Sequence, residues 1–195
     1  LKLPRKINKV NLKRRDLRFP VPRGFGKKLE GKKLLSIHRR AKYLIFEMED
    51  GYFINHLGMT GSWRKFLSPQ KHDHCHFHFD KGLVLSFCDP RRFGYFDYLK
   101  KDEIDDNRWF NHLGPEPLDD EGFNFEYLKK TLNKKTAPIK NLVMDQKIVV
   151  GVGNIYVAEA LFLSKVAPQR KGHTLKDSEI KNLVLNIKKI ISGAI

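Results

Sequence analysis

The sequence predicts an α+β protein, with a strand-rich first part over residues 1–112 and a helical second part over residues 119–195. In the first part, short runs alternate apolar with polar residues, which is typical of half-buried strands. In the second part, apolar residues recur three and four positions apart, as they do on one face of a helix. Residues 113–118 contain two prolines and a glycine, which interrupt regular structure, so they are predicted to form a linker.

Composition and charge limit the classes of partner. The 195 residues include 41% apolar residues, which is enough for a substantial core, and 38 Lys and Arg against 22 Asp and Glu, for a net charge of +16. This excess favours a polyanionic partner, most simply DNA or RNA. Cys75 and Cys88 are too few for a disulfide framework and suit a reducing compartment. Because no apolar run is long enough to span a membrane, we expect a cytoplasmic protein without membrane association.

Several strands are predicted in the first part. Residues 7–17 read as a strand, and residues 43–48 and 52–57 read as an antiparallel pair around Asp50-Gly51. Such a dipeptide favours a tight hairpin turn because glycine tolerates a positive φ. The stretch from Phe19 to Lys33 is rich in proline, glycine and lysine and is predicted to be a loop.

The second part is predicted to contain a series of helices. Segments 123–132 and 137–146 have helical spacing, and a longer helix is expected to start at a capping box from Thr174 to Asp177. One apolar face defines this last helix: Ile180, Leu183, Val184, Ile187 and Ile191.

The stretch from Met144 to Phe162 is the most distinctive one. It reads as a short apolar run, a Gly-Val-Gly turn, and a helix with Asn154 at the N-cap position. A second set of residues then recurs at helical spacing: Ile155, Ala158, Glu159 and Phe162. The free N–H groups at such a helix start suit an anion, such as a nucleic-acid phosphate. An ordinary turn before a core helix is the alternative interpretation.

Alternating histidines occupy one predicted strand. His74, His76 and His78 fall on one face of this strand, and Cys75 falls on the other. Alternate histidines can share a metal ion, but the cysteine would point to the opposite side. A half-exposed strand that carries polar histidines is the interpretation favoured by the pattern.

Two loops carry residue types suited to a nucleic-acid groove. Met59 stands between Gly58 and Gly61, where a flexible apolar side chain could either insert between bases or fold back on the core. Arg91 and Phe93 follow Pro90 in a second loop, where arginine can contact phosphate or base edges and phenylalanine can stack. A surface turn with one buried aromatic side chain is the alternative for the second loop.

Six blocks in order carry a family resemblance. They are RRAKYL at 39–44, HLGMTGS at 56–62, KHDH at 71–74, DPRRFG at 89–94, HLGPEPL at 112–118, and MDQKIVVGVGNIYVAEALF at 144–162. The chain resembles the formamidopyrimidine-DNA glycosylase family of base-excision repair, which is related to endonuclease VIII. The resemblance implies an N-terminal β-sandwich domain followed by a helix–two-turn–helix DNA-binding domain, with DNA bound between them.

The resemblance also implies an activity and roles for residues. Members of the family flip oxidised purines (8-oxoguanine, formamidopyrimidines) out of duplex DNA, cut the glycosidic bond, and nick the strand by β- and δ-elimination through a Schiff base. Lys42 matches the family lysine that donates a proton in β-elimination. The remaining matches are the void-filling residues Met59, Arg91 and Phe93, and the DNA-contact residues His72, Arg91, Lys135, Lys140 and Asn154.

The blocks correspond to the central portion of such an enzyme. The family's N-terminal Pro-Glu motif, whose proline amine is the nucleophile, and its four-cysteine zinc finger have no counterpart here. We therefore expect no cofactor in this chain, no metal site, and a monomer that binds damaged double-stranded DNA. Two other hypotheses stand beside the glycosylase/AP lyase: a non-catalytic helix–two-turn–helix protein that binds structured RNA, and a metal-binding protein that uses the alternating histidines.

Overall fold

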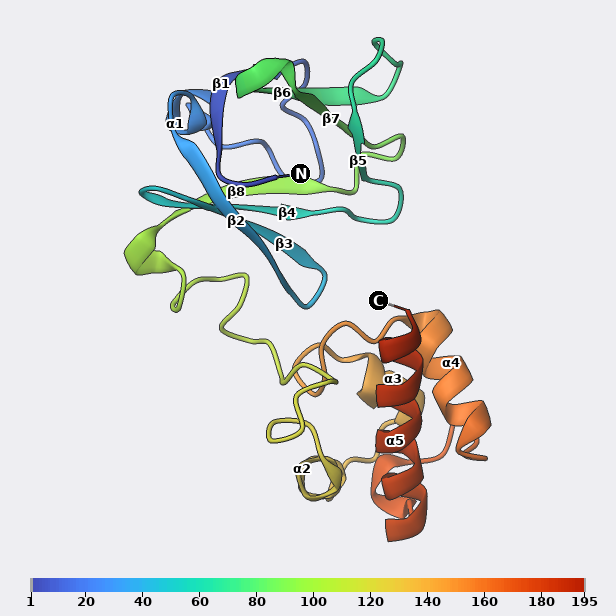
Figure 1. Cartoon of the computed structure of the whole chain (residues 1–195). Helices are drawn as coiled ribbons and strands as arrows, with labels where there is room; N and C mark the ends of the chain where they lie inside the picture. Colours follow the sequence, from blue (N-terminus) through green and yellow to red (C-terminus); the bar gives the residue numbers. More distant parts are fainter. Residues whose placement is uncertain (1, 195) are drawn as a thin grey trace. The chain divides into compact units, whose positions relative to one another are not determined.

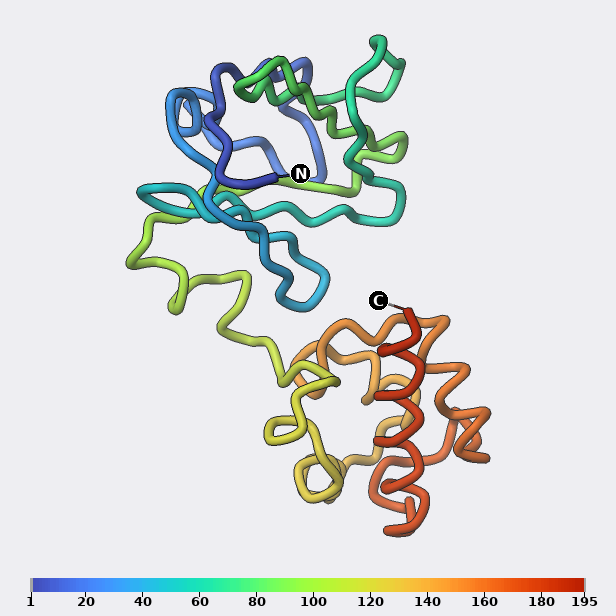
Figure 2. The backbone as a smooth tube through the Cα atoms, viewed as in Figure 1, coloured from blue at the N-terminus to red at the C-terminus, as the bar shows by residue number. Residues whose placement is uncertain are grey.

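The computed structural model describes residues 2–194. These residues form two compact units that divide between Asn107 and Arg108 and are considered separately below (Figure 1). The chain passes from the first unit to the second through the segment that follows β8 (Figure 2). The first unit contains β1 Arg5–Leu12, α1 Phe25–Leu29, β2 Lys33–Arg40, β3 Tyr43–Met48, β4 Gly51–His56, β5 Ser62–Lys65, β6 Asp73–Phe79, β7 Val84–Cys88 and β8 Tyr95–Lys100. The second contains α2 Phe125–Leu132, α3 Ile139–Met144, α4 Asn154–Leu163 and α5 Asp177–Gly193.

The eight strands form a sheet that folds over on itself. Their order is β5-β7-β6-β1-β2-β3-β4-β8, and each neighbouring pair is antiparallel. Strand β1 belongs to both halves, because its first residues, Arg5 and Lys6, pair with β2 and its later residues pair with β6. The register of β1 shifts between Ile7 and Lys9, and such irregularities bend a strand. The result is the predicted β-sandwich, whose two layers are visible in Figure 1.

Aromatic side chains join the two layers. Phe53 of β4 stacks on Phe77 of β6 with their ring centroids 5.4 Å apart, and both rings are almost completely buried. Phe25 of α1 stacks on Phe96 of β8 at 5.5 Å and closes the same cluster. Phe53, Phe77 and Phe96 occupy inward-facing positions of their strands, as the alternation of side chains along a strand requires, and Phe25 adds a ring from α1.

The predicted hairpin is confirmed, and one element was missed. Tyr43 pairs with His56 and Met48 pairs with Gly51, so Asp50-Gly51 lies at the predicted turn. The prediction of a loop from Phe19 to Lys33 is wrong at its centre, because α1 forms there. Phe25 and Leu29 stand four residues apart on this short helix and are both fully buried. Tertiary packing therefore overrides the glycine-rich local sequence.

The helical unit has its own core. Side chains from all four helices and from the turn before α4 are buried together, among them Leu128, Leu142, Val152, Leu161 and Leu183. The predicted apolar face of α5 is confirmed, since all five of its residues are buried. The predicted capping box at Thr174 is wrong, however. Thr174 ends a 3-10 turn, and Glu179 instead accepts the backbone N–H of Lys176 to cap α5.

Helix α4 corrects two predictions. Its N-cap is Gly153 rather than Asn154, which is the first residue of the helix, and no side chain caps the helix start. The apolar set that includes Ile155 and Phe162 faces outward, with exposed fractions of 70% and 81%. Val157 and Leu161 form the buried face instead. Helical spacing was correctly recognised, but both faces of this helix are apolar, so periodicity could not identify the inner one.

Among residues 2–194, no helix combines the length and the apolar character that a membrane crossing requires.

We expect Phe77→Ala to lower the free energy of unfolding of the first unit by about 3–5 kcal/mol, because it removes a fully buried ring from the junction of the two layers. Leu67→Ala is the control, since Leu67 is 83% exposed and its loss is expected to change stability by less than about 0.5 kcal/mol. Urea unfolding followed by tryptophan fluorescence measures both. Equal stability of the two variants would show that this ring does not join the layers.

Candidate nucleic-acid interface

Met59 projects from the loop between β4 and β5. Its side chain is 71% exposed, although it is flanked by half-buried residues. The loop is itself well ordered by backbone contacts, because Gly61 N–H donates to Leu57 O at 2.9 Å. The structure therefore excludes the alternative that Met59 folds back on the core.

Arg91 and Phe93 lie together on the loop between β7 and β8. The guanidinium carbon of Arg91 is 4.6 Å from the centroid of the Phe93 ring, which is a cation–π contact. Both side chains are exposed, Phe93 to 40%. The alternative of a surface turn with a buried aromatic is wrong for Phe93, and the pair presents a positive charge beside an apolar ring.

The two loops are in direct backbone contact. Gly58 has a φ of +67°, and a Cβ atom there would lie 2.6 Å from the carbonyl carbon of Phe93. Gly94 is just as confined, since a Cβ atom would approach His56 O at 2.9 Å and the Phe87 ring at 2.8 Å. Only glycine permits this approach. The structure thus brings together the three residues that the resemblance assigns to void filling.

His72 lies at the end of the turn that leads into β6. Beside it, the buried Asp73 carboxylate accepts hydrogen bonds from Arg64 Nη2 at 2.6 Å and from the backbone N–H of Gln70 at 2.9 Å. The backbone carbonyl of His72 accepts the N–H of Asp89 at 3.1 Å. These bonds connect the turn at His72 to the strand end from which the Arg91 loop begins.

Lys42 occupies the turn between β2 and β3, next to Ala41, whose φ is +54°. The side chain as a whole is exposed, but protein atoms around it partly desolvate the ammonium group and lower the pKa of Lys42 below its ordinary value. A lysine with a lowered pKa gives up its proton more readily near neutral pH. Lys42 is the residue that the resemblance assigns to proton donation.

His56 lies where β4 enters the Met59 loop, and its ring stacks on that of Tyr95 with centroids 5.3 Å apart. Its Nδ1 accepts the N–H of Gly58 at 2.9 Å, a role that requires an unprotonated nitrogen. Burial lowers the pKa of His56, and the positive charges of Arg18 and Lys42 lower it further. The neutral ring therefore supports the start of the loop at neutral pH.

The other DNA-contact residues implied by the resemblance lie in the helical unit. Lys140 is on α3 and half-buried, Asn154 begins α4 and is exposed, and Lys135 is exposed in the turn before α3. Gly151, with a φ of +77°, turns the chain ahead of α4, and its N–H donates to Gln146 Oε1 at 3.1 Å. The carbonyl of Lys135 accepts the backbone N–H of His173.

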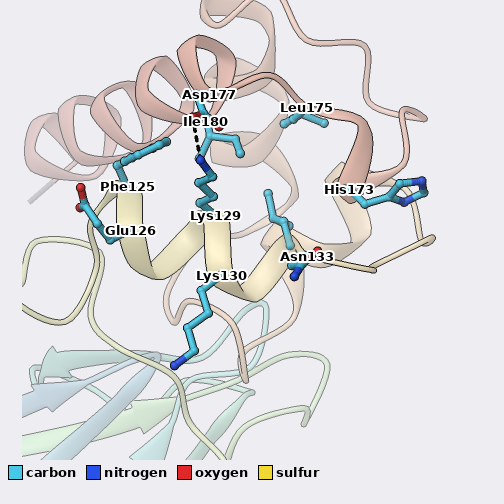
Figure 3. Close-up of a pocket in the computed structure, with 11 residues that line it drawn as sticks. Phe125, Glu126, Lys129, Lys130, Asn133, His173, Leu175, Asp177 and Ile180 are labelled. Atoms are coloured by element: carbon cyan, nitrogen blue, oxygen red, sulfur yellow. Dashed lines mark hydrogen bonds and ion pairs between the residues drawn. The ribbon is translucent and has the colours of Figure 1, made fainter.

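A hollow of about 580 Å³ in the helical unit lies between α2 and the start of α5 (Figure 3). Lys129 crosses it to form an ion pair with Asp177 at 2.7 Å, while Lys130 and His173 point away from this pair (Figure 3). Lys129 and Lys181 also lie over the Phe125 ring. None of the predicted DNA-contact residues lines this hollow, and two of its charged residues, Lys129 and Asp177, are paired with each other.

The alternating histidines are used within the fold. His74 and His76 are buried, so the prediction of a half-exposed histidine strand is wrong for both. His74 bonds to the carbonyl of Asp89 at 2.7 Å, His76 to Ser86 Oγ at 2.7 Å, and the His78 Nε2 atom to the Asn11 amide at 3.1 Å. Within residues 2–194, no three His, Cys, Asp or Glu side chains are arranged to hold a metal ion, so the third hypothesis gains no support.

Family models match both units. The model of the formamidopyrimidine-DNA glycosylase N-terminal domain matches residues 2–96, and that of the formamidopyrimidine-DNA glycosylase H2TH domain matches residues 113–195. A β-sandwich with two touching, exposed loops, followed by a helix–two-turn–helix unit, thus defines a protein of the DNA glycosylase class.

Individual relatives agree with these matches. A formamidopyrimidine-DNA glycosylase of Legionella pneumophila subsp. pneumophila is 45% identical over 198 residues, covering 98% of this chain and 70% of the relative. One from Zymomonas mobilis is 43% identical and covers 97% and 71%. The structure of Lactococcus lactis Fpg in complex with abasic-site DNA superposes with a TM-score of 0.91 at 35% identity, covering 98% of this chain and 72% of that one. The chain belongs to the formamidopyrimidine-DNA glycosylase family.

Two residues that support the exposed loops, Thr60 and Asp89, were not identified from the sequence pattern. Thr60 Oγ1 donates to the carboxylate of Asp89 at 2.5 Å, and Asp89 is completely buried. The signal that could have found them is a carboxylate placed directly after an apolar strand, because a buried charge needs polar partners from other segments.

We expect acidification to loosen the Met59 loop through His56. Because its folded pKa is lowered, its stabilising effect is complete above about pH 6.5, the ordinary histidine value, and is lost as the pH falls from there through the folded pKa. The loss is on the order of 1 kcal/mol, the contribution of one hydrogen bond. Unfolding midpoints at pH 7 and pH 5 measure it.

The control is His56→Asn, whose amide oxygen can accept the Gly58 N–H without titrating. This variant should lack the part of the pH dependence that comes from His56. An identical acid-induced loss in both proteins would contradict the role of His56.

Proposed function

We propose that this protein is a DNA glycosylase and AP lyase that removes oxidised purines from duplex DNA and nicks the strand by β- and δ-elimination. The observation that carries the proposal is the pair of touching loops that present Met59, Arg91 and Phe93 to solvent. Exposed apolar side chains that gather on neighbouring loops suit a binding surface, and insertion into a nucleic acid is the use that we propose for them.

Base flipping gives these side chains a task. Extruding a nucleotide costs a few kcal/mol of lost stacking and pairing, which contacts in the vacated space must offset. Met59 and Phe93 supply apolar surface for this space. Arg91 adds a planar group with several N–H donors, which suits the edge of the unpaired base on the opposite strand. We assign Arg91 to the orphaned cytosine.

The net charge of +16 supports a DNA partner, because phosphate neutralisation supplies most of the sequence-independent affinity. Within the helical unit, we assign phosphate contacts to Lys135, Lys140 and Asn154. Asn154 begins a ten-residue helix with an N-terminus that no side chain caps, so its free N–H groups are available to a phosphate. His72 is assigned to the DNA backbone next to the first two loops.

Lys42 is proposed as the proton donor in β-elimination. Its lowered pKa supports this role, because proton transfer is most effective when the pKa of the donor approaches the working pH. We assign lesion holding and proton donation to side chains of this chain and leave the Schiff-base amine unassigned.

The solved relatives support the choice of substrate. The Lactococcus lactis protein has been crystallised with DNA that contains an abasic site and with DNA that contains Fapy-dG, both at 35% identity to this chain. A further structural match is MutM in complex with carbocyclic 8-oxo-G DNA. We therefore propose oxidised purines opposite cytosine as the substrate class.

We expect the protein to bind a duplex carrying a tetrahydrofuran abasic-site analogue opposite cytosine more tightly than the same duplex without damage. Met59→Ala and Phe93→Ala should each reduce this preference about tenfold, because each removes surface that fills the void. Fluorescence anisotropy at fixed salt measures both affinities. Leu185→Ala is the matched control, since it truncates an exposed apolar residue of α5 that has no proposed role.

Two results would count against the proposal. Equal affinity of the unmodified protein for damaged and undamaged duplexes would remove lesion recognition. A clear preference for structured RNA, without any response to damage, would instead favour the non-catalytic helix–two-turn–helix hypothesis.

We expect the ε-ammonium group of Lys42 to titrate below 10.5, the ordinary lysine value. Carbon-13 NMR of the lysine ε-carbons measures this pKa over a range of about pH 7–12, which includes the ordinary lysine value. The signal of Lys42 is identified because it is missing from the spectrum of Lys42→Arg. Because a donor must be protonated, elimination that depends on Lys42 should decline as the pH rises through this lowered pKa. A midpoint at or above the ordinary value would contradict the desolvation argument.

A further inference from the structure

Asp89 is a buried carboxylate beside the two exposed loops. It is 0% exposed, and within residues 2–194 no lysine or arginine forms an ion pair with it. A buried carboxylate is costly unless hydrogen bonds satisfy its oxygens. Its side chain does not reach the surface, so it cannot touch DNA directly.

The carboxylate of Asp89 joins the two exposed loops. Oδ1 accepts the hydroxyl of Thr60 at 2.5 Å, and Thr60 follows Met59 directly in the chain. Oδ2 accepts the N–H of Gly94 at 2.7 Å, directly after Phe93. The same Thr60 oxygen accepts the N–H of Arg91 at 3.2 Å. Every residue with a proposed void-filling role therefore stands at, or next to, a residue bound in this network.

The backbone of Asp89 adds a third segment. Its N–H donates to the carbonyl of His72 at 3.1 Å. Its own carbonyl accepts the N–H of Arg92 at 3.2 Å and the buried ring nitrogen Nε2 of His74 at 2.7 Å. One residue thus has bonded contacts with the Met59 loop, the Arg91–Phe93 loop and the turn that carries His72.

We propose that Asp89 is a positioning residue for lesion recognition, and that it acts through Thr60 to hold the three segments as a single rigid reader of damaged DNA. The inference rests on the proposed function. Side chains that fill a void must hold their place while stacked bases press against them, and order that exists before binding does not have to be created during binding. A buried hydrogen-bonded network also gives a more unique geometry than apolar packing alone.

Thr60 offers a cleaner test than Asp89 itself. Thr60→Val keeps the shape of the side chain but loses the hydroxyl that bonds to both Asp89 and Arg91. Thr60→Ser keeps the hydroxyl. Ser86→Ala is a matched control, because it removes another buried hydrogen bond of the same unit, that from Ser86 Oγ to His76, without touching the loops.

The first measurement is hydrogen exchange of the free protein. Backbone amide exchange reports local opening, so release of the network should accelerate exchange at Arg91 and Gly94 even though the substitution is in the other loop. We expect this acceleration in Thr60→Val and not in Thr60→Ser or Ser86→Ala. Unchanged exchange at Arg91 and Gly94 in Thr60→Val would overturn the proposed connection, whatever the protein binds.

The second measurement is the ratio of affinities for the tetrahydrofuran:cytosine duplex and the undamaged duplex. Thr60→Val should lower this ratio about tenfold, the effect of one charge-assisted hydrogen bond, with little change in affinity for undamaged DNA. Thr60→Ser should preserve it, and Ser86→Ala should preserve it despite a lower melting temperature.

The outcomes distinguish a failure of the positioning role of Asp89 from a failure of the proposed function. If Ser86→Ala also lowers the ratio of affinities for damaged and undamaged duplex, Asp89 contributes only to the general stability of the unit, and its positioning role is overturned. A wild-type ratio retained in Thr60→Val would do the same. A third outcome is faster exchange at Arg91 and Gly94 in Thr60→Val, together with an unmodified protein that binds damaged and undamaged duplexes equally. That outcome would refute the proposed function, and the positioning role with it.

Discussion

The packing of Phe53 against Phe77 across the two layers is the contact on which the rest of the first unit depends. These rings fill the space between the two layers and hold β4 against β6. Because β4, β5, β7 and β8 are paired in the folded sheet, their connecting loops meet, and His56 stands opposite Tyr95. The position of the loops follows from packing in the core, because Gly58 and Phe93, which are 35 residues apart in the chain, come into contact.

The interface divides its tasks between exposed and buried groups. Met59, Arg91 and Phe93 are exposed, and none of them is well placed to hold its own loop. The bonds that hold the loops come from Thr60, Asp89 and the two glycines that allow close approach. Such a division lets the exposed side chains be chosen for contact with DNA while the polar network carries the demand for rigidity. The cost is a buried carboxylate that depends on every one of its partners.

How much the sequence predicts depends on the range of the interaction involved. The hairpin at Asp50-Gly51 and the apolar face of α5 follow from local periodicity and turn chemistry, and both were predicted correctly. The helix α1, the burial of His74 and the inward face of α4 depend on which segments pack together, which a local pattern does not encode. The family blocks contain Asp89 and Thr60 as well as Met59 and Arg91, but they do not show that Asp89 supports the loops, because that role depends on its partners from distant segments. Every role assigned to a site residue stays a prediction: those of Lys42, Met59, His72, Arg91, Phe93, Lys135, Lys140 and Asn154.

Charge and shape contribute differently to recognition by such a protein. A net charge of +16 attracts any duplex, and that attraction weakens with salt without distinguishing damaged from intact DNA. Discrimination needs a response to how easily one nucleotide leaves the stack, which is a property of the damaged site. In the proposed function, the apolar side chains of Met59 and Phe93 supply that response only if their loops do not move when stacked bases press against them. In the function that we propose, net charge therefore sets how tightly DNA is held, whereas the rigidity of the Met59 loop and the Arg91–Phe93 loop sets which DNA is preferred. The hydrogen bonds that hold both loops meet at the buried carboxylate of Asp89.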